Sequence, residues 1–94
     1  MNYIIPESRI NQLVFSYLDS LNMDVMYAIP NIKFLNGDYY ALVYNTKYMY
    51  LDVSPKFFNI IRNMFGLNEE RIENILSSWV EQKLGVEILS ILNF

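Results

Sequence analysis

The chain is 94 residues long, its composition is 53% hydrophobic and 18% charged, and its formal net charge at pH 7 is −3. A chain of this length has room for one hydrophobic core, so we expect one domain over residues 1–94, and this composition excludes disorder for most of it. The absence of cysteine and histidine excludes disulfide bonds, thiolate nucleophiles, zinc sites with sulfur or nitrogen ligands, and histidine-based catalysis.

The hydrophobic segments of the sequence are too short to cross a membrane. The longest stretch without a charged residue has nine residues, Ile10 to Leu18, whereas a membrane-spanning helix needs about 20. No basic stretch leads into an apolar one near the N-terminus, so no signal peptide is predicted. Together with the absence of cysteine, these observations favour a soluble, cytoplasmic protein.

The first predicted element is a helix that begins at Pro6, since proline is favoured at the first helical position. Its apolar residues recur every three or four positions and therefore share one face. These residues are Ile10, Leu13, Val14, Tyr17, Leu18 and Leu21. Phe15 lies outside this face.

The following segment predicts a three-stranded antiparallel meander. The strands are expected at residues 26–35, 39–44 and 47–53. Asn36-Gly37 is a strong signal for a two-residue hairpin turn, and Asn45-Thr46 is a weaker turn signal. Pro30-Asn31 marks an irregularity or an edge position within the first strand.

Two further helices are predicted after the meander. Ser54-Pro55 fits the start of the second helix and Gly66 its end, and its residues are apolar nearly all round, so we expect it to be mostly buried. Asn68 is the expected N-cap of the third helix, which ends at Gly85. Its apolar stripe consists of Ile72, Ile75, Leu76, Trp79, Val80 and Leu84. We expect Trp79, in the middle of this stripe, in the core.

Residues 86–94 fit either a strand or a continuation of the third helix. On a helix, Ile88, Ile91 and Leu92 extend the apolar stripe, whereas on a strand the residues at 86, 88, 92 and 94 share one face. A strand is favoured because Gly85 destabilises a helix interior by about 1 kcal/mol. The predicted fold class is α+β, with a three- to four-stranded antiparallel sheet packed with three helices in the order α-β-β-β-α-α-(β).

Tyrosines are concentrated in the second and third predicted strands. If Val43 faces Tyr48, strand alternation sorts this hairpin into two faces. One face contains Tyr39, Ala41, Val43, Tyr48, Tyr50 and Asp52, and the predicted Asn36-Gly37 turn adds Ile32 and Phe34 to it. We expect Phe34, Tyr39, Tyr48 and Tyr50 on this face to bind a partner. The opposite face, the expected core side, contains Tyr40, Leu42, Tyr44, Met49, Leu51 and Val53. Helices covering both faces are the alternative, but Asp52 on the tyrosine face argues against its complete burial.

No arrangement of residues predicts catalysis. No histidine is present to act as a base for a serine, and the three glycines are explained by a turn and two helix ends. Glu69, Glu70 and Glu73 are candidate ligands for Mg²⁺ or Ca²⁺, but they fit a solvated helix start better. We therefore expect no enzyme activity, no metal and no cofactor, and a function in binding another protein or in self-association as a homo-oligomer.

A second hypothesis is binding of single-stranded nucleic acid, because sheet aromatics can stack on bases. The candidate aromatic residues are Tyr39, Tyr48 and Tyr50, and the basic residues in the same segment are Lys33, Lys47 and Lys56. The net charge of −3 and the pI of about 4.7 argue against a dedicated binder of phosphate backbones. Protein binding is therefore favoured over nucleic-acid binding.

The opening of the chain, from Met1 to Ile10, resembles the start of many short proteins encoded by tailed bacteriophages. The shared feature is a Tyr-Ile-Ile-x-Glu-Ser run followed by an amphipathic helix, and the segment Trp79-Val80-Glu81 is similar as well. The resemblance implies a phage-encoded accessory or host-modulating protein of the host cytoplasm. It carries over no catalytic residue.

Overall fold

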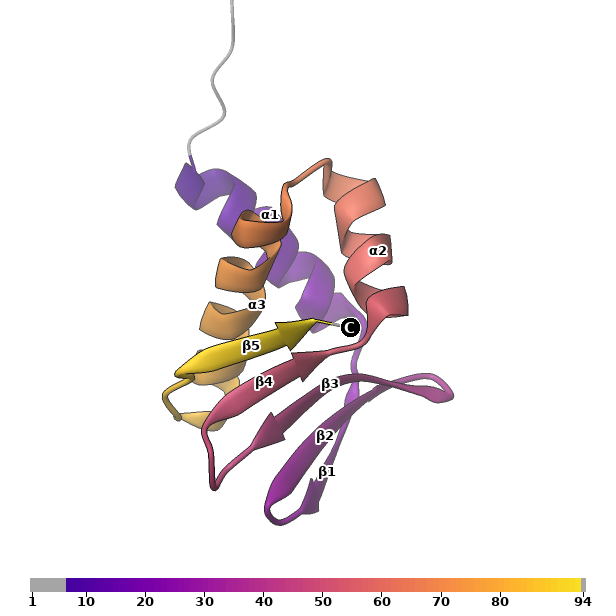
Figure 1. Ribbon diagram of the computed structural model, residues 1–94. Coiled ribbons are helices and arrows are strands. Elements are labelled where there is room, and N and C mark those ends of the chain that lie inside the picture. Colours follow the sequence, from indigo (N-terminus) through magenta and orange to yellow (C-terminus); the bar gives the residue numbers. More distant parts are fainter. Residues whose placement is uncertain (1–6, 94) are drawn as a thin grey trace, which may run out of the picture.

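Three helices and one five-stranded sheet form residues 7–93, the part of the chain that the computed structural model describes (Figure 1). The helices are α1 (Glu7–Ser20), α2 (Pro55–Phe65) and α3 (Glu69–Leu84). The strands are β1 (Asp24–Ala28), β2 (Asn31–Asn36), β3 (Tyr39–Asn45), β4 (Tyr50–Val53) and β5 (Ser90–Asn93). The predicted α+β class is confirmed, with five strands in place of the predicted three to four.

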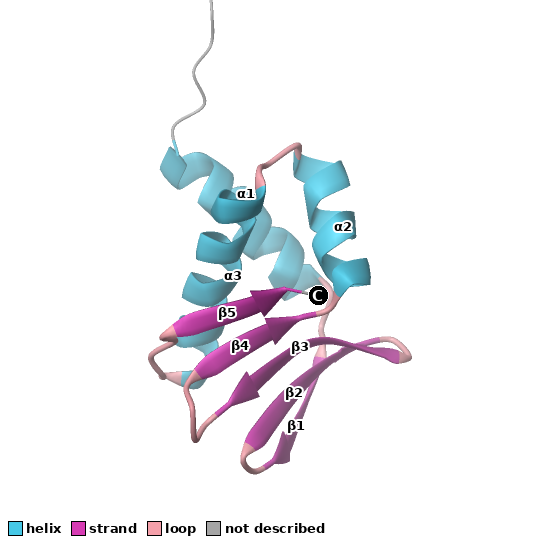
Figure 2. Ribbon diagram, in the orientation of Figure 1, coloured by secondary structure: helices cyan, strands magenta, loops and turns pink. Residues whose placement is uncertain are grey.

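The strand order in the sheet is β1-β2-β3-β4-β5. β1 to β4 follow one another through short turns and pair antiparallel, whereas β5 pairs parallel to β4. The parallel pairing differs from the predicted antiparallel sheet because α2 and α3 form a crossover between β4 and β5. Figure 2 shows the helices gathered on one face of the sheet, while no helix of residues 7–93 covers the opposite face.

The apolar face predicted for α1 is largely the buried one. Val14 and Leu18 are buried, and Ile10, Tyr17 and Leu21 pack partly against the core. Leu13 is half exposed, whereas Phe15 packs against the core, so the helix is rotated slightly from the predicted orientation. The predicted start at Pro6 and the opening residues 1–6 lie outside the described residues.

The predicted ends of α2 and α3 are confirmed. Oδ1 of Asn68 accepts a hydrogen bond from the backbone N–H of Arg71 at 2.8 Å, and Ser54 adopts the extended backbone of an N-cap. Gly66 and Gly85 end the helices with φ values of 64° and 65°, which glycine adopts most readily. None of the helices within residues 7–93 is long and apolar enough to cross a membrane.

The segment predicted as the first strand is in fact the hairpin of β1 and β2. The chain reverses at Ile29-Pro30, and Ala28 pairs with Asn31. Proline has no N–H to donate to a strand ladder, so a reversal suits it better than a strand interior. The carbonyl of Pro30 accepts a hydrogen bond from the N–H of Thr46 at 2.7 Å, which joins this turn to the turn between β3 and β4.

The turn predicted at Asn36-Gly37 lies one residue later. Asn36 pairs with Tyr39, so Gly37 and Asp38 form the turn, and Gly37 has a φ of 70°. This displacement alone moves the strand pairing by two residues. It therefore leaves each side chain on its predicted face, because side chains alternate with a period of two.

A β-bulge in β3 changes the faces. Leu35 pairs with Tyr40 but Phe34 pairs with Leu42, so Ala41 is an extra residue between the two pairs. Side chains alternate between the two faces along a strand. Because of the extra residue in β3, Phe34 and the β2 residues before it share a face with different β3 residues from those expected without the bulge. Phe34 consequently lies on the same face as Leu42, and the prediction that placed it on the other face is wrong.

The core lies between the helices and one face of the sheet. Its buried side chains come from the three helices and from β2, β3 and β4, whereas every β1 side chain is exposed. Trp79 is 5% exposed, which confirms its predicted place in the core. The prediction for α2 holds for Phe57, Phe58 and Ile61, which are buried, but Met64 is 54% exposed, so α2 is one-sided.

The strand interpretation of residues 86–94 is confirmed for residues 90–93, which form β5, whereas residues 86–89 form neither strand nor helix and Phe94 lies outside the described residues. Two hydrogen bonds hold the segment that precedes this strand. The hydroxyl of Tyr44 donates to the carbonyl of Glu87 at 2.9 Å, and the N–H of Leu89 donates to the carbonyl of Met49 at 2.8 Å. These bonds place β5 along β4.

Candidate functional site

The four residues predicted to form one partner-binding face lie in different places. Phe34 is 1% exposed and packs in the core against Trp79, with ring centroids 5.6 Å apart. Tyr39 packs against the core on the helix side of the sheet. Tyr48 lies in the turn between β3 and β4 and is 63% exposed, while Tyr50 is half-buried on the face without helices. The structure therefore does not bring these four side chains together.

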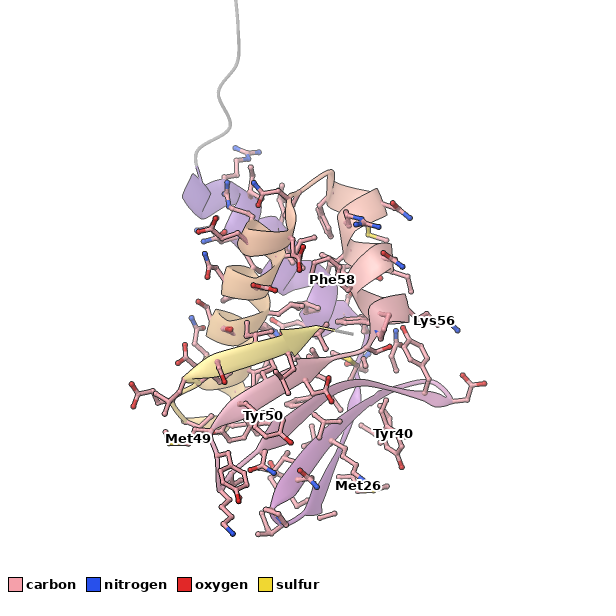
Figure 3. The ribbon with its side chains drawn as sticks, viewed as in Figure 1. Met26, Tyr40, Met49, Tyr50, Lys56 and Phe58 are labelled. Atoms are coloured by element: carbon pink, nitrogen blue, oxygen red, sulfur yellow. The ribbon has the colours of Figure 1, made fainter. Side chains whose placement is uncertain are left out.

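The face of the sheet opposite the helices, called the open face below, carries both apolar and polar side chains. Its apolar members include Met26, Leu35, Tyr40, Val43, Tyr50 and Leu92, and its polar members include Asp24, Asn31, Lys33, Asn45, Asp52 and Ser90. Met26, Tyr40 and Leu92 are 45%, 46% and 39% exposed. Figure 3 shows Met26 and Tyr40 on the side of the sheet away from Phe58 of α2. Uncovered apolar side chains that extend over several strands are typical of a contact surface.

Lys33 and Asp52, which carry opposite charges, lie within the open face on either side of Val43, and Asp24 adds a second carboxylate at the edge of this face. The Nζ atom of Lys33 lies 5.0 Å from the ring centroid of Tyr40, within the range of a cation–π contact. Asp52 is partly buried, and this burial raises the pKa of its carboxyl group above the usual value. A partner that covers Asp52 must therefore supply a hydrogen-bond donor or favour the protonated carboxyl group.

Replacing Asp52 with asparagine is expected to raise the melting temperature at pH 7. The folded state binds the Asp52 carboxyl proton more tightly than the unfolded chain, so the contribution of Asp52 to wild-type stability is greatest below the usual carboxyl pKa and decreases as pH rises through the raised pKa. The asparagine side chain does not titrate, so the gain from Asp52→Asn should shrink as pH falls to about 3. Thermal unfolding measured across this range tests the expectation.

Asp24→Asn serves as the matched control, because Asp24 lies on the same face but is exposed at the sheet edge. We expect its melting temperature to stay close to the wild-type value at pH 7. A gain from Asp52→Asn that is equally large at pH 7 and in acid would show that burial of the charge is not its cause.

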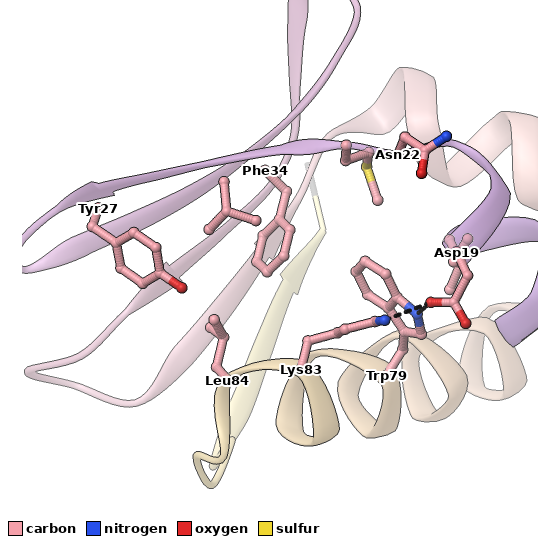
Figure 4. A pocket seen from close by; sticks show the side chains of 10 residues that line it. Asp19, Asn22, Tyr27, Phe34, Trp79, Lys83 and Leu84 are labelled. Carbon is pink, nitrogen blue, oxygen red and sulfur yellow. Dashed lines mark hydrogen bonds and ion pairs between the residues drawn. The ribbon is translucent and has the colours of Figure 1, made fainter.

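A groove of about 260 Å³ lies beside the edge strand β1, between β1, β2 and the C-terminal ends of α1 and α3 (Figure 4). Its apolar lining residues are Leu18, Met23, Val25, Tyr27, Phe34, Trp79 and Leu84. Its polar lining residues are Asp19, Asn22 and Lys83. Because Tyr27 is 67% exposed, the groove is open on the β1 side.

One carboxylate organises the polar end of the groove. The indole Nε1 of Trp79 donates to Oδ1 of Asp19 at 3.0 Å, and Nζ of Lys83 lies 2.8 Å from the same oxygen. Hydrogen bonds from Lys83 and then from Trp79 hold the pKa of Asp19 below its usual value. Asp19 is therefore kept as a carboxylate, and its contacts join the end of α1 to α3.

Sequence reasoning missed the exposed residues Met26, Tyr40 and Leu92 and the groove. Pro30 is the signal from which the exposure of Met26 could have been predicted. If Pro30 is interpreted as part of a hairpin turn, Met26 lies on a separate edge strand, β1. The face of Tyr40 depends on the bulge at Ala41, which no turn or proline signal marks. The groove depends on how α1 and α3 pack at their ends, which periodicity does not describe.

The lysine–tyrosine contacts are spread over the molecule. The pairs are Lys33 with Tyr40 at 5.0 Å, Lys47 with Tyr48 at 5.2 Å, and Lys56 with Tyr39 at 4.5 Å. They lie on the open face, in the turn between β3 and β4, and on the helix side of the sheet. A surface for single-stranded nucleic acid needs its aromatic and basic groups along one groove, and these three pairs do not lie along one groove.

Within residues 7–93, no three acidic side chains come close enough together to hold a metal ion, and this includes Glu69, Glu70 and Glu73. Comparison with known proteins finds no matching family model, no matching curated protein and no matching solved structure. Function is therefore inferred from the surface geometry of this chain.

Proposed function

We propose that this chain is a non-enzymatic domain that binds another protein through the open face of its sheet. The observation that carries the proposal is the one-sided arrangement of the helices, which leaves Met26, Tyr40 and Leu92 uncovered on the opposite face. A partner that covers these side chains gains about 25 cal/mol for each Å² of apolar surface removed from water. The open face thus offers a favourable contact that the chain's own helices do not use.

The composition of the open face suits a protein partner. A tyrosine buries a large ring with few torsions to order and keeps its hydroxyl group in water, and Tyr40 and Tyr50 both lie on this face. Lys33 and Asp52 add one charge of each sign around Val43. We expect the partner to present an apolar patch with an acidic group near Lys33 and a hydrogen-bond donor near Asp52.

The proposed setting is that of a phage-encoded accessory or host-modulating protein in the host cytoplasm. The resemblance of the opening residues to tailed-phage proteins supports this setting. It says nothing about the open face, so the two parts of the proposal rest on different observations.

The double variant Tyr40→Ser with Tyr50→Ser is expected to lose the partner while remaining folded. Interface aromatics often contribute about 2 kcal/mol or more each, so the loss of two should lower affinity roughly 1,000-fold. The experiment compares immobilised wild type and variant in a bacterial lysate, and then measures dissociation constants with the purified partner. Circular dichroism and melting temperature confirm the fold of each variant.

Tyr48→Ser is the matched control, because it removes the same side chain from an exposed turn outside the open face. A partner retained by wild type and control but lost by the double variant supports the proposal. Equal binding to all three chains contradicts it. Tight binding of a mixed-sequence single-stranded oligonucleotide at about 150 mM salt, weakening steeply as salt is raised, would favour nucleic acid instead.

A further inference from the structure

The outer edge of β1 is open and apolar. β1 is the first strand in the sheet order, and no strand within residues 7–93 pairs with its outer side. Val25, Met26, Tyr27 and Ile29 are four of the ten large hydrophobic side chains exposed in this part of the chain. Natural edge strands are commonly protected by charged side chains, proline or a bulge, and Asp24–Ala28 has only one of these features, the carboxylate of Asp24 at its first position. Its unpaired N–H and C=O groups are therefore available to another strand.

We propose that a second copy of this chain pairs with this edge, with the two β1 strands antiparallel about a two-fold axis at Met26. In this register Val25 of each copy lies opposite Tyr27 of the other, an aromatic–β-branched pair that stabilises sheets. Asp24 lies opposite Ala28, so the two Asp24 carboxylates stand about 14 Å apart. Strand β1 is thus complementary to itself in its apolar pairing, and the register keeps the two Asp24 carboxylates apart.

The groove beside β1 adds a second contact to this pairing. Val25 and Tyr27 point to the helix side of the sheet and line the groove together with Phe34 and Leu84. The paired strand places its own Tyr27 opposite Val25, on the same side of the sheet and at the mouth of the groove. Tyr27 is 67% exposed, so the pairing removes two tyrosine rings from water.

A symmetric β1 pair closes at two copies, whereas pairing between different edges does not end there. The other edge strand within residues 7–93, β5, has four residues, and contact of β1 in one copy with β5 in the next would continue into a larger ring or an open filament. A two-fold β1 pair ends at the dimer and joins the two open faces into one continuous sheet surface. This inference goes beyond the proposed function, because it assigns the edge rather than the open face and holds even if that face binds nothing.

The dimer is expected to be weak. One edge pair and two Tyr27 contacts bury less than a standard interface of about 1,600 Å². We therefore expect a dissociation constant in the micromolar range, so that sedimentation across about 1–100 µM takes the mass from the 11.2 kDa of one chain towards twice that value.

The first test is Tyr27→Lys, which places a charge on the apolar edge at a side chain that is exposed and therefore not needed for folding. Dimerisation should weaken at least ~30-fold, whereas the exposed-turn control Tyr48→Lys should dimerise like wild type. A wild-type chain that stays monomeric throughout this range overturns the inference. A dimer that Tyr27→Lys leaves intact also overturns it, and would point to a different surface.

The second test uses the absence of cysteine from the chain. With the two-fold axis at Met26, Met26→Cys brings the two Cα atoms to about 4.5–5.5 Å, which suits a disulfide bond. Ala28→Cys, two residues along the same strand, leaves its two Cα atoms about 14 Å apart. Mild oxidation should therefore cross-link Met26→Cys but not Ala28→Cys. Equal cross-linking of both variants, or of neither, would contradict the proposed register.

Discussion

Replacing Trp79 with alanine is expected to lower the free energy of unfolding by about 3–5 kcal/mol. Trp79 is 5% exposed, its ring packs against Phe34, and its Nε1 donates to Asp19. The substitution therefore leaves a cavity between α3 and the sheet and removes one link between α3 and α1. A chain of 94 residues has a total stability of about 5–14 kcal/mol, so much of the fold depends on this side chain.

Trp79→Phe separates packing from hydrogen bonding. Phenylalanine keeps most of the ring contact with Phe34 but cannot donate to Asp19, so a smaller loss of about 1–2 kcal/mol is expected. Urea unfolding of the wild type, Trp79→Ala and Trp79→Phe measures both effects. The three unfolding curves are compared with the same dependence of the unfolding free energy on urea concentration. An unchanged midpoint for Trp79→Ala would show that the stripe of α3 does not face the core.

The helices were predictable because their signals are local. The caps Asn68, Gly66 and Gly85 act within a single turn of chain, and the stripe around Trp79 repeats at the helical period. These features need no knowledge of distant residues. For the same reason the sequence indicated the strand character of most of residues 26–53 and favoured a strand over a helix for residues 86–94.

The number of strands and their register depend on less local effects. Pro30 marks an irregularity in the sequence, but whether the chain bends or reverses there is decided by what pairs on either side. In the structure this turn is held by the hydrogen bond from Thr46 to Pro30, sixteen residues away in the chain. The parallel position of β5 likewise follows from the packing of α2 and α3.

The candidate site was predictable in kind but not in its residues. Apolar side chains on both faces of the strands are compatible with helices on both sides or with an uncovered face, and in the structure one face is uncovered by the helices of residues 7–93. Which tyrosines lie there depends on the bulge at Ala41, because one extra residue exchanges the two faces of a strand relative to its neighbour. Tyr50 and Asp52 lie beyond the bulge on β4, and their predicted side agrees with the structure.

Phe34→Ala is expected to cost about 3–5 kcal/mol of stability, whereas Tyr40→Ala should stay within about 1 kcal/mol of wild type. The two residues lie on neighbouring strands but on opposite faces. Phe34 is 1% exposed against Trp79, while Tyr40 is 46% exposed on the open face. The predicted register without the bulge reverses this order, because it places Phe34 outside and Tyr40 in the core.

Urea unfolding of the two variants under the same conditions therefore decides between the registers. A large loss for Phe34→Ala with a small loss for Tyr40→Ala is the outcome that the bulge at Ala41 requires. The reverse order would move Tyr40 into the core and Phe34 onto the open face, and would remove Tyr40 from the proposed binding surface. Because Phe34 contacts Trp79, the double variant Phe34→Ala with Trp79→Ala should lose less stability than the two single variants together. Additive losses would show that the two substitutions do not open one shared cavity and that the two rings do not pack together.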